Sequence, residues 1–307
     1  MYLKKNEGGR FARIILDRWF KRTFGEESRK RLLMLFLEAL IPERKIANLT
    51  YVNGEHINMF PEGHKGIIDV ECVDENGARF MVEMQIHKQE SFYDRAVLYS
   101  SFGVQQQVLA GSGDDYRMRP LYFIGLMDFS MHRGSDEVLF RYSVQNDDGS
   151  GERMTENLHF IFLELPNCSK ALTPEAGILD NFCYALHNME NLPERPKELK
   201  GEIFKLLFDS AEISSFAVDE QKKYEQDMTT ERDLRNQLAY AKKEGREEGI
   251  AVGVAKGRAD GITEGIARGK TEEKTEIARK LLAEGMDINF VSKTCGLSID
   301  EVKSLIK

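Results

Sequence analysis

The sequence predicts a mixed α/β domain that ends near residue 225 and is followed by a helical tail. Two observations support this fold class. Up to residue 211, apolar residues at helical spacing alternate with short strand-like segments. Beyond residue 225, glycine recurs at every fourth position from 245 to 269, which is an internal repeat with a helical period. We therefore divide the chain into residues 1–225, 226–275 and 276–307.

The first part opens with two amphipathic helices. Residues 11–24 place Phe11, Ile14 and Phe20 near the spacing of a buried stripe, and a leucine-rich helix then runs to Pro42. From there the pattern changes to short strands with one long helix among them. The expected strands span residues 48–52, 66–73, 78–86, 121–127 and 158–163, and the expected helices span 91–110, 178–189 and 199–211.

Size and composition exclude several classes of protein. A chain of 307 residues with 41% apolar positions can bury a core, so wholesale disorder is excluded. Its longest apolar runs are far shorter than the about 20 residues that cross a bilayer. No secretory signal opens the chain, and the four cysteines form no C-x-x-C pair. We expect a cytoplasmic protein with reduced thiols and no membrane partner.

Charge is distributed unevenly along the chain. The net charge is −8, yet residues 1–50 carry 12 Lys and Arg against 6 Asp and Glu, while residues 51–220 carry 14 against 29. A basic arm beside an acidic body could hold a phosphate backbone next to a cation site. A merely solvated N-terminal helix explains the same counts.

Residues 66–86 read as a β-hairpin with Asn76-Gly77 in its turn. A three-residue loop that ends at Gly77 sets Asp69 opposite Glu83, and it is the register that keeps both faces of the hairpin amphipathic. Two carboxylates about 5 Å apart repel each other unless one is protonated or a cation lies between them. A hard divalent ion is the natural partner, and a solvated polar face is the alternative.

The helix over residues 91–110 follows this hairpin. Its apolar positions suit covering a sheet, while Arg95, Tyr99 and Gln106 or Gln107 can share a flank. That flank could line a cleft between the helix and the edge of the sheet.

These residues resemble a known family. Asp69, then Glu83-x-Gln85, then Phe92-x-x-Arg95 with Tyr99, Gln107, Gly111 and the strand that follows Pro120, is similar to the recombination-promoting nuclease or putative transposase family of PD-(D/E)xK nucleases. Phe20-Lys21, Phe24-Gly25 and the periodic glycines of the tail add to the resemblance, which covers nearly the whole chain.

The resemblance implies a restriction-endonuclease-like core that hydrolyses DNA phosphodiesters. Asp69 and Glu83 would bind Mg²⁺, or Mn²⁺ or Ca²⁺ in its place, with the Met84 carbonyl as a third ligand. Gln85 would occupy the place of the usual lysine, and a neutral amide can only orient water. Arg95 is the candidate for the missing positive charge. The expected role is recombination, the spread of mobile elements or defence; the alternative is an inactive DNA-binding or interaction protein that keeps the fold.

The tail has two features of its own. Its glycine stripe either packs against an identical helix in a homo-oligomer or belongs to a linker without a partner. Residues 276–307 contain three short helical segments, with a capping box at Ser298–Glu301, as in a helix-turn-helix or any small helical bundle. Weaker candidates are His56 and His64, which lack a third zinc ligand, and Ser112, which lacks the context of a hydrolase nucleophile.

Overall fold

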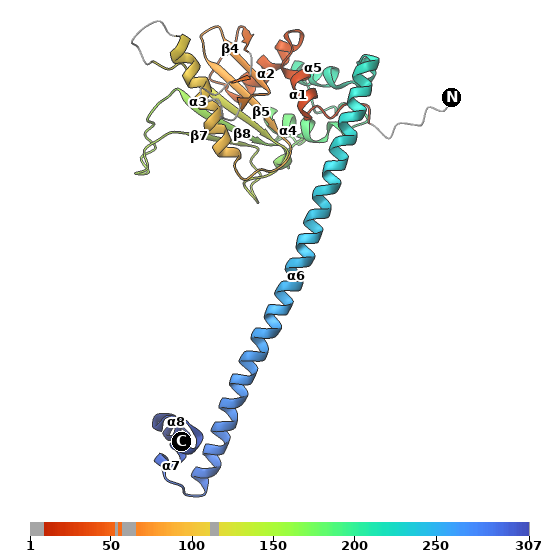
Figure 1. Ribbon diagram of the computed structural model, residues 1–307. Helices are drawn as coiled ribbons and strands as arrows, with labels where there is room; N and C mark the ends of the chain where they lie inside the picture. Colours follow the sequence, from red (N-terminus) through yellow and green to blue (C-terminus); the bar gives the residue numbers. More distant parts are fainter. Residues whose placement is uncertain (1–8, 53–54, 57–65, 111–116, 307) are drawn as a thin grey trace, which may run out of the picture. The chain divides into compact units, whose positions relative to one another are not determined.

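The computed structural model describes residues 9–52, 55–56, 66–110 and 117–306 (Figure 1). The chain forms two compact units, Met1–Asp227 and Met228–Lys307. Strands lie only in the first unit among the described residues, whereas the second is helical. The predicted mixed α/β class with a helical C-terminal region is confirmed.

A six-stranded mixed sheet forms the centre of the first unit. Its strands lie in the order β1-β4-β5-β6-β8-β7, in which β5, β6 and β8 run parallel and the other neighbours run antiparallel. The strands are β1 (Leu49–Tyr51), β4 (Val70–Asp74), β5 (Arg79–Gln85), β6 (Leu121–Met127), β7 (Leu139–Ser143) and β8 (Leu158–Glu164). A separate two-stranded ladder pairs β2 (Glu55–His56) with β3 (Gly66–Ile67).

Helices cover both faces of this sheet (Figure 1). Strand alternation turns Met81 and Phe123 toward one helix, α3 (Phe92–Ala110), where they share a buried apolar cluster with Phe92. On the other side, aromatic rings of Phe24, Phe36 and Phe182 join the helices to one another. These helices are α1 (Asp17–Phe24), α2 (Lys30–Leu40), α4 (Ile178–Asn188) and α5 (Glu202–Ala211), with 3₁₀ turns η1 (Glu27–Arg29), η2 (Leu165–Asn167), η3 (Met189–Asn191) and η4 (Ile213–Ser215).

Several elements differ from the sequence prediction, two of them in the first unit at its start and at the edge of its sheet. The helix expected over residues 11–24 begins only at Asp17, because Phe11 pairs with Glu212 in a β-bridge and the Ala12 N–H donates to the Ala211 carbonyl at 2.8 Å. The apolar spacing of residues 11–16 indicated that their side chains are buried. An extended segment can bury these side chains as well as a helix can. Strand β7 was not predicted, since an exposed edge strand lacks a buried alternating pattern.

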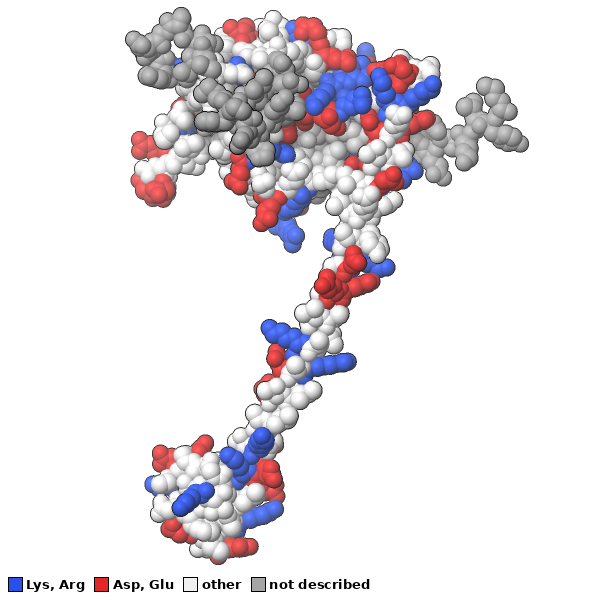
Figure 2. Space-filling model, in the orientation of Figure 1, with Lys and Arg blue, Asp and Glu red and all other residues white. Residues whose placement is uncertain are grey.

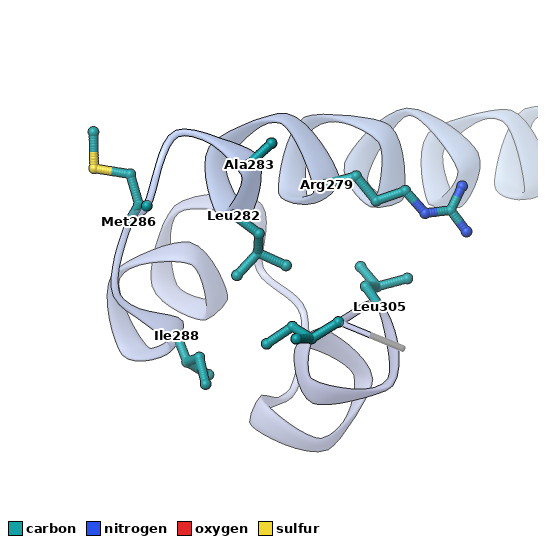
Figure 3. Close-up of a pocket in the computed structure, with 8 residues that line it drawn as sticks. Arg279, Leu282, Ala283, Met286, Ile288 and Leu305 are labelled. Atoms are coloured by element: carbon teal, nitrogen blue, oxygen red, sulfur yellow. The ribbon is translucent and has the colours of Figure 1, made fainter.

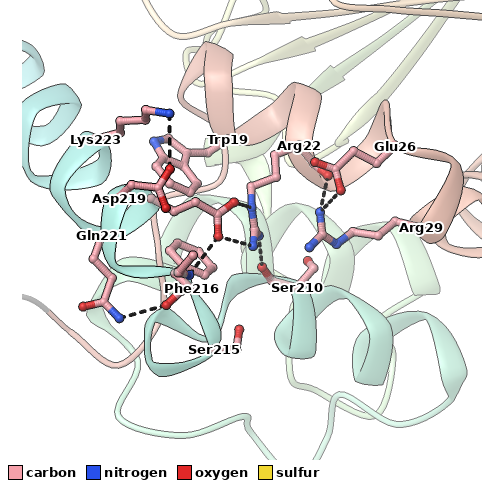
Figure 4. Close-up of polar contacts among 12 residues, drawn as sticks. Trp19, Arg22, Glu26, Arg29, Ser210, Ser215, Phe216, Asp219, Gln221 and Lys223 are labelled. Atoms are coloured by element: carbon pink, nitrogen blue, oxygen red, sulfur yellow. Dashed lines mark hydrogen bonds and ion pairs between the residues drawn. The ribbon is translucent and has the colours of Figure 1, made fainter.

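The start of the long helix α6 (Val218–Ala283) packs against α1 within the first unit (Figure 4). Trp19 stacks on Phe216 with ring centroids 4.9 Å apart. Arg22 lies over the same ring, and its Nε donates to Glu220 Oε1 at 2.7 Å. These contacts fix the rotation of α1 about its own axis, which decides which of its side chains face the sheet.

The second unit ends in a small three-helix core. The last turns of α6 pack on α7 (Ile288–Cys295) and α8 (Ile299–Ser304) around four buried side chains, Ala278, Val291, Cys295 and Val302. Ser298 and Glu301 form the predicted capping box. The segment expected as a separate short helix from Ile277 is the continuous end of α6. Leu282, Ile288 and Leu305 line an apolar hollow between these helices (Figure 3).

The central part of α6 is exposed along its whole length. Figure 2 shows acidic and basic side chains next to one another on this helix. Arg268 and Glu272 form an ion pair on it, with Nε and Oε1 2.8 Å apart. No described atom lies within 4 Å of a Cβ placed on any of the periodic glycines beyond the helix's own neighbouring backbone. Within the described ranges, every helix is too short or too polar to span a lipid bilayer.

Gly125 of β6 is expected to tolerate no side chain. A Cβ there would lie 2.7 Å from Phe162 Cδ1 and 3.0 Å from Phe92 Cζ, and both rings are buried. Gly125→Ala should therefore lower the free energy of unfolding by about 1–3 kcal/mol, measured by urea denaturation with the single tryptophan, Trp19, as the probe. Lys205→Ala, at an exposed position of α5, is the control and should not destabilise. Equal destabilisation by both variants would contradict this packing.

Candidate metal centre

The hairpin of β4 and β5 has the predicted register. Val70 pairs with Val82, and Gly77 takes the left-handed conformation with φ of 80° at the last position of the loop. Continuing this register sets Asp69 opposite Glu83. The two acids thus lie at neighbouring strand ends, close enough for the Asp69 carboxylate to raise the pKa of Glu83.

The strand expected over residues 66–73 is interrupted, and Asp69 lies in the break. Strand β3 ends at Ile67 and β4 begins at Val70. In the gap, the Met84 N–H donates to Asp69 Oδ2 at 2.8 Å. The Asp69 carboxylate thus accepts the hydrogen bond that a backbone carbonyl would accept in a regular strand. The β4–β5 ladder therefore ends at the pair of Val70 and Val82, one residue before Asp69 and Glu83.

The two carboxylates are buried. Only 10% of the Asp69 side chain and 10% of the Glu83 side chain is exposed. Nearby, Glu71 is fully buried in an ion pair with Arg79, whose Nη1 also donates to Gln106 Oε1 at 2.8 Å. The alternative of a solvated polar face is therefore wrong, because α3 covers this face. Glu71 is engaged by its own arginine and does not join the pair.

Burial and mutual repulsion shift the protonation of both acids. Burial raises the pKa of Glu83 to about 8, and the neighbouring Asp69 carboxylate adds to the rise. Burial also raises the pKa of Asp69 to about 6, although the Met84 N–H opposes the shift. At neutral pH, Glu83 is therefore mostly protonated in the metal-free protein. Among the described residues no group hydrogen-bonds to Glu83 Oε2, which is buried.

Gln85 and Arg95 lie beside the pair and contact each other. Arg95 Nη2 is 3.4 Å from Glu83 Oε1 and also donates to Gln85 Oε1, while Gln85 Nε2 donates to the His87 carbonyl at 2.8 Å. Both ends of the amide are thus engaged by the protein. Gln85 orients the guanidinium, and Arg95 brings a positive charge to Glu83.

The other residues predicted on the same flank of α3 have different partners. Tyr99 stays with Arg95, whose Cζ is 5.9 Å from the centre of its ring. Gln107 instead accepts a hydrogen bond from the Arg119 N–H at 2.7 Å, and Gln106 belongs to the separate ion pair of Arg79. Consecutive helical residues point about 100° apart, so one flank cannot include them all.

Sequence reasoning missed Lys21 as a residue of this site. Lys21 Nζ lies 3.3 Å from Asp69 Oδ1 and 2.7 Å from Asp17 Oδ1. Burial alone would lower the pKa of Lys21, but Asp17 and Asp69 outweigh it and raise the pKa above its usual value. The spacing of Asp17 and Lys21 indicated only an ordinary pair on one helix. Its contact with Asp69 arises from tertiary packing.

The donor set suits a hard divalent ion. Mg²⁺ is bound in many proteins by one or two carboxylates and keeps several waters. Asp69, Glu83 with its unpaired Oε2, and a backbone oxygen such as that of Met84 provide such a set. In the described part of the chain, no three His, Cys, Asp or Glu side chains come together as a metal-binding group. His64, Ser112 and the side chain of His56 lie outside the described residues.

Comparison with known proteins gives two family matches. Residues 14–241 match a family described as PD-(D/E)XK nuclease family transposase, and residues 271–307 match the C-terminal HTH domain of the Rpn/YhgA-like nuclease family. No curated protein and no solved structure gives a significant match. The mixed sheet flanked by helices is consistent with the restriction-endonuclease-like fold that the resemblance implied. Since the larger match covers more than half of the chain, this protein belongs to the PD-(D/E)XK nuclease family of transposases.

Proposed function

We propose that the chain is a metal-dependent endonuclease that hydrolyses DNA phosphodiester bonds. The observation that supports this most is the buried pair of Asp69 and Glu83, one oxygen of which has no partner among the described residues. Two neighbouring acids are costly to bury unless positive charge offsets them, and Lys21 and Arg95 each contact one oxygen of the pair. The family match supplies the reaction class.

Each residue of the site has a distinct role in this proposal. Asp69 and Glu83 would hold a divalent ion together with the Met84 carbonyl, and the ion would supply the chemistry of water activation and phosphate neutralisation. The Met84 N–H keeps the Asp69 carboxylate in place. Gln85 holds Arg95 against Glu83, so that the guanidinium keeps Glu83 Oε1 in a fixed position. Burial by α3 limits water around these groups.

DNA is the proposed partner of both units. The helix-turn-helix match at residues 271–307 favours DNA contact by the tail, since the second helix of such motifs commonly enters the major groove. The nuclease unit would then cut DNA to which the tail is bound. Recombination, the movement of mobile elements, or defence against foreign DNA are the roles that this combination suits.

A plasmid assay tests the proposed reaction. Supercoiled plasmid is incubated with the purified chain and Mg²⁺, Mn²⁺ or EDTA, and nicked and linear products are resolved by gel electrophoresis. We expect nicking with either metal and none with EDTA. Well-folded protein that binds plasmid but never nicks it would favour the alternative, an inactive DNA-binding protein with a nuclease fold.

We further propose that α6 assembles the chain into a homo-oligomer. Exposed apolar side chains directly follow four of the periodic glycines: Ile250, Val254, Ile262 and Ile266, which are 48–63% exposed. Each step of four residues overshoots a helical turn by about 40°, so this stripe winds slowly around the axis. A second copy of the helix would cover the stripe, and the missing side chains would allow close approach of the two backbones.

Removal of the second unit should therefore abolish assembly. The full chain is expected to be a multimer and Met1–Asp227 a monomer, by light scattering coupled to gel filtration. Within the full chain, Gly257→Leu should weaken assembly because it blocks close approach. Glu247→Leu, about half a turn away from the neighbouring glycines, is the matched control and should leave the mass unchanged. A full-length chain that is already monomeric would reject this interface.

A further inference from the structure

Among the described residues, Gln85, Arg95 and Lys21 lie beside the carboxylate pair. Of these three, Lys21 is the positively charged one that contacts Asp69. The Gln85 amide is engaged at both ends. Arg95 contacts Glu83, Gln85 and Gln89, and lies over the Phe92 ring. The Lys21 side chain is 37% exposed, whereas that of Arg95 is 23% exposed.

We propose that Lys21 is the residue that contacts the phosphate of the DNA strand to be cut, and that it supplies the charge that Gln85 cannot. This inference rests on the proposed nuclease function. A flexible ammonium beside a metal-binding carboxylate is well placed to stabilise the negative charge that develops on a phosphate under attack. Lys21 reaches the site from α1. The place on β5 where the resemblance expects a lysine is occupied by Gln85, which is a neutral amide.

Asp17 is the residue that positions this lysine. Lys21 Nζ lies between two carboxylates and is closer to Asp17 than to Asp69, at 2.7 Å against 3.3 Å. A divalent ion on Asp69 competes with the ammonium for the same oxygen charge. Asp17 lies four residues earlier on the same helix, so it keeps Lys21 beside the site after that contact weakens.

The orientation of α1 supports this arrangement. Arg18 and Trp19 both contact Asp227 at 3.0 Å, and Arg22 binds Glu220, so these side chains fix the helix to the start of α6. Lys21 instead contacts Asp17 and Asp69. Its position at Asp69 is thus built into the packing of α1.

The test compares Lys21→Met and Lys21→Arg with Lys30→Met in the full chain. Lys30 forms an ion pair with Glu27, three residues earlier in the chain, and neither Asp69 nor Glu83 is its partner in that pair. We expect Lys21→Met to lower the turnover number for plasmid nicking about 100-fold or more, Lys21→Arg to restore most of it, and Lys30→Met to match the wild type. Asp17→Asn should cause a smaller loss, about threefold to tenfold.

Metal binding in the absence of DNA separates this role from a structural one. In calorimetric titration with Mn²⁺, Lys21→Met should bind the ion as tightly as the wild type or more tightly, because a competing positive charge is removed. Weaker Mn²⁺ binding together with lost activity, or nicking by Lys21→Met equal to that of Lys30→Met, would overturn the inference. Absence of nicking by the wild type would instead reject the proposed function itself.

Discussion

Asp69→Asn and Glu83→Gln are each expected to lower metal-dependent plasmid nicking by at least about 100-fold. Either change replaces one of the two carboxyl groups of a buried donor set with a neutral amide of the same size. In the same titration with Mn²⁺, both variants should lose most of the heat of binding. Unlike Lys21→Met, these two changes should therefore remove metal binding together with activity.

Asp94→Asn is the matched control for this pair. Asp94 is an exposed acid in the first turn of α3, one residue before Arg95. It loses the same charge without touching the carboxylate pair, so its nicking rate should stay within about twofold of the wild type. Wild-type rates in both Asp69→Asn and Glu83→Gln would end the metal-site proposal.

The metal-free protein is expected to become less stable as the pH rises from 5 to 8. Glu83 has a pKa of about 8 in the folded protein and an ordinary value of 4.5. Between these values the folded chain holds a proton that the unfolded chain releases, so this contribution is complete below about pH 4.5 and is lost as the pH approaches 8. Because each pKa unit corresponds to about 1.4 kcal/mol, the loss should be on the order of a few kcal/mol.

Urea denaturation in EDTA at pH 5, 6, 7 and 8 measures this loss. Glu83→Gln should flatten most of the dependence and should be more stable than the wild type at pH 8, although it is inactive. Adding Mn²⁺ at pH 8 should raise the stability of the wild type and leave Glu83→Gln unchanged. Parallel pH curves for the two proteins would show that Glu83 is not the group that titrates.

Local patterns made much of this fold predictable. Strand alternation and the Asn76-Gly77 turn gave the register of β4 and β5, since only one pairing keeps apolar side chains on one face. The run from Leu121 to Met127 was predicted to the residue, because a buried parallel strand is apolar on both faces. Predictions failed where distant backbone competes for hydrogen bonds, as Ala211 and Glu212 do with residues 11–12.

The residues of the candidate site were also predictable only in part. The sequence by itself determined that Asp69, Glu83 and Gln85 share one face and that Arg95 follows on a helix, because these residues lie on one hairpin and the helix after it. Only the tertiary structure decided that Lys21 reaches Asp69 and that α3 buries Glu71 and Glu83. Register depends on neighbours along two adjacent strands, whereas charge placement and burial depend on how helices distant in sequence pack on the sheet.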